Sequence, residues 1–283
     1  MKILIKAIGF IGDNLFGSSV AKKLKDSYPN STIDYLLTLP QPLELLGNNP
    51  YIDNVLLSTD ESQYDVIHQL KPLHRKETPC IQFQKQCKVP NPSSEFDIIT
   101  NSNLDKYVNH MLSPYQGVKI AWMSNWEEKS FLYSEEEYKR GIDVPNLGYG
   151  GKRRDIKFII NSLSQLPNVY LFEVGKPVGY SQKEVDLMTV SEYTLTASLI
   201  KSCDYFIGGE GGLCNLAAGV GTSTIITGDY VHQLYGWNGV IERNQTPKLG
   251  PIHYFNSGHY ELNPYLTDKE VVANIKNIID NEV

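Results

Sequence analysis

One stretch of this chain, Asp204 to Asp229, constrains the fold more than any other. It reads DYFIGGEGGLCNLAAGVGTSTIITGD. Tyr205–Ile207 has the β-forming residues of a short buried strand, Leu213–Val220 is alanine-rich and helix-prone, and Thr222–Thr227 is a second β-branched strand. The stretch therefore predicts a strand, a glycine turn, a helix and a further strand, which is the repeating unit of an α/β domain.

The turn inside this stretch surrounds a single acid, Glu210, with glycines. They are Gly208, Gly209, Gly211 and Gly212. A glycine turn that opens a helix can bind an anion, because backbone N–H groups point outward and the helix dipole favours negative charge. Glycines can also serve only to make a tight turn. Four of them in five positions favour a ligand site.

Composition narrows the class of protein. The chain has 283 residues, enough for one large domain or two ordinary ones, and 41% of them are hydrophobic, enough to bury proper cores. The net charge is −6, whereas nucleic-acid-binding proteins are usually basic. A nucleic-acid partner is therefore disfavoured.

The cysteines and the N-terminus suggest the cellular compartment. No two of Cys80, Cys87, Cys203 and Cys214 have C-x-x-C spacing, so we expect reduced thiols and no zinc site. The apolar run of MKILIKAIGFIGD is too short for a signal peptide, and no run reaches the length of a membrane span. We expect a cytoplasmic protein without a transmembrane segment, and leave peripheral membrane contact open.

The first residues predict the start of a parallel α/β domain. Lys2–Ile8 alternates as a strand, Gly9–Asn14 reads as a turn, Leu15–Tyr28 as a helix and Thr32–Thr38 as a second strand. The apolar residues that recur at every fourth position of this helix are Phe16, Val20, Leu24 and Tyr28.

Asp13, at the end of the first turn, is the acid of greatest interest. It can act as an N-cap for the following helix, or as a carboxylate at the mouth of a cleft that takes a proton. Position alone favours the N-cap. The turn is GxxGD and not GxGxxG, so a Rossmann dinucleotide site is not indicated.

The middle of the chain predicts a boundary between two domains. Lys71–Pro92 reads as irregular, and Leu104–Leu112 as a helix. Ser113–Gly117 reads as a linker, which divides the chain into domains of residues 1–115 and 116–283.

The second half restarts the α/β pattern with a strand, Val118–Met123, that ends at Ser124. A glycine-rich loop then leads to the basic run Lys152-Arg153-Arg154 and a helix over Asp155–Leu166. Most such runs are solvated surface, but cations at a helix start oppose the dipole, so binding a diphosphate is an alternative. The further elements expected are the strand Val169–Val174 and the helices Tyr193–Cys203 and Leu266–Ile279.

Both ends of the chain resemble the heptosyltransferases of glycosyltransferase family 9. IGFIGDNLFGSSVAKKLKDSYPNSTIDYLL is similar to their N-terminal GxxGD motif, and LLGNNPYIDNVL to the segment that follows it. IKSCDYFIGGEGGLCNLAAGVGTSTIITGD is similar to the family's D-(S/T)-G-x-x-H region. The resemblance covers about half of the chain.

The resemblance implies a GT-B fold, in which two Rossmann-like domains face each other across a cleft. It implies inverting, metal-independent transfer from a nucleotide-diphosphate sugar to a hydroxyl acceptor such as a glycan. Asp13 would be the base, between Gly12 and Asn14 of the acceptor-side loop. The donor-binding residues would be Gly209, Glu210, Gly211, Gly212, Asn215, Ser124, Lys152 and Arg153, with Lys129 as an alternative cation.

The chain departs from the family at three donor-site positions. Glu210 replaces the family's aspartate, Gly211 its hydroxyl residue and Asn215 its histidine. Gly211 offers no hydroxyl to a phosphate, and Asn215 donates a hydrogen bond but carries no charge. A heptose donor is therefore one option among several. A sugar-nucleotide epimerase or hydrolase, and a non-catalytic binding module, are the alternative functions.

Overall fold

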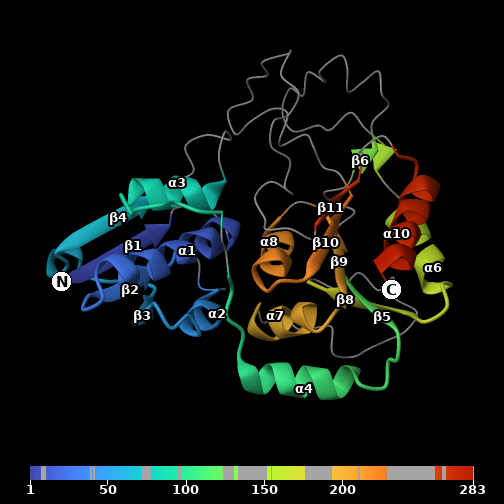
Figure 1. Ribbon diagram of the computed structural model, residues 1–283, viewed down its shortest axis with the longest axis horizontal. Helices are drawn as coiled ribbons and strands as arrows, with labels where there is room; N and C mark the ends of the chain where they lie inside the picture. The colour runs from blue at the N-terminus through green and yellow to red at the C-terminus, as the bar shows by residue number, and fades with distance from the viewer. Residues whose placement is uncertain are drawn as a thin grey trace, which may run out of the picture.

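The computed structural model is built on two parallel sheets with helices packed on them, and a short antiparallel pair of strands lies in the second half (Figure 1). The residues it describes are 1–7, 11–38, 40, 42–71, 78–94, 97–123, 131–132, 152–153, 155–175, 193–209, 211–227, 259–262 and 266–282. Each sheet lies in one half of the chain, as the α/β pattern of the sequence predicts.

The sheet of the N-terminal half has four parallel strands in the order β3-β2-β1-β4. They are β1 (Lys2–Ala7), β2 (Thr32–Leu36), β3 (Asn54–Leu56) and β4 (Val66–Leu70). The helices of this half are α1 (Ile11–Ser27), α2 (Leu43–Gly47), the 3-10 turn η1 (Glu61–Gln63) and α3 (Pro79–Gln86). Strand β1 is central and leads directly toward α1.

The sheet of the C-terminal half has five parallel strands in the order β11-β10-β9-β5-β8. They are β5 (Val118–Met123), β8 (Val169–Val174), β9 (Tyr205–Gly208), β10 (Ser223–Ile226) and β11 (Tyr260–Glu261). The helices are α6 (Ile156–Ser164), α7 (Tyr193–Lys201), α8 (Gly212–Gly219) and α10 (Asp268–Glu282). Strand β9 is central and leads toward α8.

The chain crosses between the halves through α4 (Ser102–Leu112), which packs on α7. Just before α4, the backbone N–H of Ile98 donates to the carbonyl oxygen of Gly219 at 2.7 Å. Residues ahead of the predicted 115/116 boundary thus already contact the second half. The boundary itself stays a prediction.

Three expectations for the N-terminal half were wrong. Helix α1 begins at Ile11, inside the stretch predicted as a turn. Tyr28 lies beyond the end of α1 and is 49% exposed, so it does not continue the buried stripe. The region predicted as irregular contains α3, which Thr78 caps by accepting a hydrogen bond from the backbone N–H of Ile81.

Aromatic and aliphatic side chains fill the interior of both halves. Trp122, Phe172 and Phe206 of the second sheet are fully buried, and so are Ile3 and Ile5 of the first. The four cysteines are buried, free thiols. Among the described residues, no helix is long and apolar enough to cross a membrane.

Candidate functional site

The candidate site lies at two points where a strand ends and a helix follows it. Strand β1 ends at Ala7 and α1 begins at Ile11, while β9 ends at Gly208 and α8 begins at Gly212. Open α/β sheets bind ligands outside the carboxyl ends of their strands, which is where both helices start. Each sheet therefore contributes one helix N-terminus to the site.

The first turns of α1 and α8 are in contact (Figure 1). A β-carbon built on Gly12 would lie only 2.4 Å from Nδ2 of Asn215. One built on Gly212 would lie 3.4 Å from Cγ2 of Ile11. The two helices approach this closely because glycine occupies one side of each contact.

This contact brings together residues from both predicted motifs. Gly12 and Asp13 belong to the GxxGD turn, and Gly212 and Asn215 to the glycine-rich stretch. The backbone N–H of Asn215 donates to the carbonyl oxygen of Gly211 at 3.0 Å, so Asn215 closes the first turn of α8.

The electrostatics of the contact favour an anion. Each helix N-terminus carries about half a positive charge, so two of them side by side repel, and the carboxylate of Asp13 in the first turn of α1 offsets part of this repulsion. Gly211, the N-cap of α8, has no side chain with which to cap the first N–H groups of the helix. An anion between the two turns would accept hydrogen bonds from such N–H groups and offset the repulsion.

Asp13 is the third residue of α1, and not its N-cap. A carboxylate inside the first turn is favoured by the helix dipole. Behind it lies Tyr35, whose pKa is raised well above 10, first by complete burial and second by the negative charge of Asp13. The hydroxyl of Tyr35 donates to the backbone oxygen of Asn14 at 2.9 Å, which ties β2 to the turn that carries Asp13.

The other acceptor-side residue, Asn14, is fully buried. Its Nδ2 lies 3.5 Å from Oγ1 of Thr38, just beyond the end of β2. Thr38 is exposed at the same edge of the sheet, and sequence reasoning did not select it. Ile11 was missed as well, although an apolar residue inside a glycine turn is a signal of close packing.

The structure describes only some of the remaining residues that were predicted to bind the donor. Gly209 is buried at the end of β9, and Glu210 and Ser124 lie outside the described residues, as does Lys129. Lys152 and Arg153 form the short strand β7, which pairs antiparallel with β6 (Phe131–Leu132). They therefore lie in a strand ahead of α6, whereas the sequence had suggested that they open this helix.

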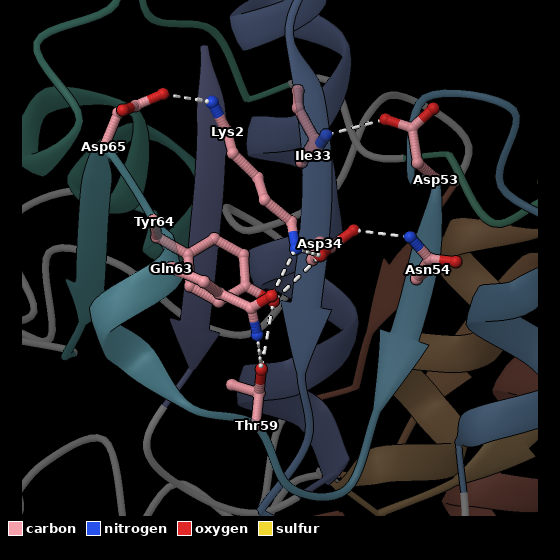
Figure 2. A network of polar contacts seen from close by, with 9 residues as sticks. All are labelled: Lys2, Ile33, Asp34, Asp53, Asn54, Thr59, Gln63, Tyr64 and Asp65. Atoms are coloured by element: carbon pink, nitrogen blue, oxygen red, sulfur yellow. Dashed lines mark hydrogen bonds and ion pairs between the residues drawn. The ribbon is translucent and has the colours of Figure 1, made fainter.

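The N-terminal half also buries a second acid, Asp34, which differs from Asp13 in its surroundings (Figure 2). Asn54 donates to one of its oxygens at 2.7 Å and the hydroxyl of Tyr64 to the other at 2.8 Å. Nζ of Lys2 lies 3.5 Å from the second oxygen and donates to Gln63 at 2.8 Å. Asp34 is thus engaged in a polar network that joins β1, β2 and β3, and has a structural role.

Two further features bear on what the site could hold. Within the described part of the chain, no three His, Cys, Asp or Glu side chains gather as a metal site. A hollow of about 940 Å³ lies at the amino ends of β5, β8 and β9, lined in part by Asp204 and Lys276. It is at the opposite edge of the sheet from α8, where α/β folds do not usually bind substrates.

No protein-family model and no curated protein sequence is significantly similar to this chain. Solved structures are similar in fold over its full length. A glycosyl transferase family 9 protein from Veillonella parvula DSM 2008 superimposes with a TM-score of 0.65 at 12% identity, covering 99% of this chain and 97% of that one. E. coli ADP-heptose lps heptosyltransferase II superimposes with a TM-score of 0.65 at 13% identity, covering 100% of this chain and 99% of that one.

A third structure, E. coli heptosyltransferase WaaC with ADP-2-deoxy-2-fluoro heptose, gives a TM-score of 0.58 at 10% identity, with both chains covered completely. At identities this low, the structural similarity establishes the fold alone, and that fold is GT-B. The fold class expected from the sequence is therefore confirmed, and so is the structural resemblance to family 9 glycosyltransferases.

Proposed function

We propose that this protein is an inverting, metal-independent glycosyltransferase that moves a sugar from a nucleotide-diphosphate sugar to a hydroxyl acceptor. The observation that supports this most directly is the contact between the first turns of α1 and α8 in a GT-B fold. Asp13 directly follows Gly12, whose contact with α8 supports this proposal, and the glycine-rich start of α8 suits a diphosphate. Residues 1–115 would take the acceptor and residues 116–283 the donor.

Asp13 acts as the general base in this proposal. It accepts the proton of the acceptor hydroxyl while the oxygen attacks the anomeric carbon from the face opposite the diphosphate. The bond between that carbon and the diphosphate oxygen breaks, and the nucleoside diphosphate leaves with the bonding electrons. A placed base typically contributes about 10²–10⁴-fold to the rate.

The leaving diphosphate is stabilised by the first turn of α8 and by the positive end of α1. Preorganised N–H groups aimed at developing charge lower the barrier more than groups that must reorient. Gly209, Gly211 and Gly212 form this cradle, Ser124, Lys152 and Arg153 complete it, and Asn215 lies beside it against Gly12. Glu210 accepts from a sugar or ribose hydroxyl, since a carboxylate facing the diphosphate would be repelled.

The donor to test first is ADP-heptose, because two of the similar structures are named for ADP-heptose or contain an analogue of it. Lipopolysaccharide is the corresponding acceptor, since one of them is an lps heptosyltransferase. The protein would carry out this transfer in the cytoplasm.

A thermal-shift screen with ADP, GDP, UDP and CMP, each with and without its sugar, tests the donor site. A ligand at one hundred times its Kd adds about 2.7 kcal/mol of stability, which is readily seen as a higher Tm. We expect one nucleotide to raise Tm. No rise with any of them would contradict the donor site.

Turnover then separates a transferase from its alternatives. We expect wild-type protein and Asp13→Ala to bind the same nucleotide, and only the wild type to transfer the sugar. Binding by both proteins with turnover by neither would identify a binding module. A free or epimerised sugar among the products would identify a hydrolase or an epimerase.

A further inference from the structure

The contact between Gly12 and the side chain of Asn215 is one of the contacts that join the first turns of α1 and α8. Gly12 directly precedes Asp13 in the first turn of α1. Asn215 is bonded through its backbone to Gly211 in the first turn of α8. Any change in this contact therefore moves the proposed base relative to the proposed diphosphate cradle.

Helix α8 is held at both of its ends. At its C-terminus, Gly219 accepts from the backbone of Ile98 at 2.7 Å. At its N-terminus, Asn215 and Gly212 lie against α1. With the far end hydrogen-bonded to the crossing segment, the contacts at the near end bear directly on how far the first turn of α8 lies from Asp13.

Among the described residues, the side chain of Asn215 limits the space at position 12. A β-carbon there would lie 2.4 Å from Nδ2 and 3.7 Å from Cγ of Asn215, with no other described neighbour within 4 Å outside the adjoining residues and the backbone of α1. Restoring ordinary van der Waals contact requires the β-carbon and Nδ2 to separate by about 1 Å, through a shift between the helices or a rotation of the Asn215 side chain. Misplacing a catalytic group by about 1 Å can cost roughly 10²-fold in rate.

We propose that Asn215 is a positioning residue, whose amide rests on Gly12 and sets the distance between Asp13 and the diphosphate-binding turn. This inference rests on the proposed function. In this role the side chain of Asn215 acts as a spacer between the two halves of the protein, and the glycine at position 12 leaves room for it.

Size exchange at the two positions tests the proposal. The variants are Gly12→Ala, Asn215→Ala and the double variant, in which the new methyl group occupies the space vacated by the amide. Gly47→Ala is the matched control, because a β-carbon there would meet nothing within 4 Å. Each protein is assayed for Tm, for the Tm rise caused by ADP, and for ADP release from ADP-heptose with lipopolysaccharide as acceptor.

We expect Gly12→Ala to lower kcat by roughly 10²-fold with little change in the donor KM. Asn215→Ala should lose less, and the double variant should recover much of the kcat lost by Gly12→Ala. A merely structural contact would change Tm without this split between kcat and KM. Normal kcat in Gly12→Ala, with the amide swinging aside, or a double variant no better than Gly12→Ala, would overturn the proposal.

The same proteins distinguish failure of the inference from failure of the proposed function. If the wild type binds ADP but does not turn over ADP-heptose, the transfer reaction is wrong, and the Tm of the unliganded variants becomes the deciding measurement. A Tm that falls in Gly12→Ala and returns in the double variant supports the packing of Asn215 on Gly12 as the link between the two turns, and equal Tm values in all variants overturn it. No rise in the wild type overturns the inference together with the donor site.

Discussion

Gly12 and Asn215 come from opposite halves of the molecule and approach so closely that a side chain at position 12 would overlap the amide of residue 215. The contact holds two positive helix ends together, and the carboxylate of Asp13 in the first turn of α1 offsets part of their repulsion. The glycine on each side allows this close approach. Asp13 follows Gly12 directly, so the proposed base lies next to the contact between the two helices.

Replacing Asp13 by asparagine tests the proposed base. Asn keeps the size of the side chain and removes its ability to take a proton, so kcat should fall by about 10²–10⁴-fold while ADP still raises Tm. Asp26→Asn is the matched control, because Asp26 is exposed at the other end of α1. Full activity in Asp13→Asn would show that another group accepts the proton.

His259 makes the stability of the C-terminal half depend on pH. Its Nδ1 accepts from the backbone N–H of Thr224 at 3.2 Å and lies 2.6 Å from the hydroxyl of the same residue. Burial lowers the pKa of His259 from 6.5 to about 4, so the folded protein favours the neutral ring. The unfolded chain therefore binds more protons between these two values, and stability falls as pH drops from about 6.5 to about 4.

Protonation of His259 lowers the free energy of unfolding by at most about 3 kcal/mol. Urea unfolding at pH 7 and at pH 4.5 should show a smaller difference in unfolding free energy for His259→Gln than for wild type. Burial also lowers the pKa of His68, so His68→Gln is measured in parallel to separate the two contributions. An unchanged pH dependence in His259→Gln would contradict the assignment.

Asp105 links α4 to α7 and is expected to act in a lower pH range. Its Oδ2 accepts from Nζ of Lys201 at 2.8 Å and from the hydroxyl of Thr100 at 2.8 Å. Burial alone would raise the pKa of Asp105, but the hydrogen bonds and the charge of Lys201 lower it below 3.8 overall. The stability that ionised Asp105 contributes is thus present above pH 3.8 and is lost as pH falls through the lowered pKa of the folded protein.

Asp105→Asn should lower the free energy of unfolding at pH 7 by about 1–3 kcal/mol, because it weakens a partly buried, charge-assisted bond. The difference from wild type should shrink as pH falls below 3.8. Asp280→Asn removes an exposed ion pair with Lys276 within α10 and should change stability by less than about 1 kcal/mol. Equal effects of the two substitutions would show that the α4–α7 link is only a surface pair.

The sequence predicts the repeating elements better than the contacts between them. Strands such as Val118–Met123 and Val169–Val174 were predicted with the bounds that the structure has. Helix α3 was missed although its signals were present: Thr78 is an N-cap followed by Pro79, the residue preferred at the first helical position. The prolines around it were given too much weight.

The spacing of the site could not be predicted in the same way. The sequence predicts the start of α8 to within one residue but places the start of the first helix at Leu15 and not at Ile11, and neither pattern carries information on the separation of the two helices. The contact depends on the packing of two domains, and in particular on the absence of a β-carbon at Gly12 and Gly212. Asn215 was selected by its place in a motif, and its packing against Gly12 follows from the structure alone.

Gly17, inside α1, is explained by the residue that packs across from it. A β-carbon at Gly17 would lie 2.2 Å from the hydroxyl oxygen of Tyr35 and 3.0 Å from Cβ of Ala7. Gly17→Ala should therefore lower the free energy of unfolding by about 1–3 kcal/mol through overpacking, although alanine is the better helix former.

Tyr35→Phe removes the hydroxyl and leaves the backbone oxygen of Asn14 without this donor, which should cost about 1 kcal/mol. In the double variant the new methyl group takes the place of the hydroxyl, so the combined loss should be smaller than the two single losses added together. Urea unfolding of the four proteins measures this coupling. Strictly additive losses would mean that α1 shifts to accommodate the methyl group. Such a shift would also move Asp13, so the kcat of Gly17→Ala would then fall together with its stability.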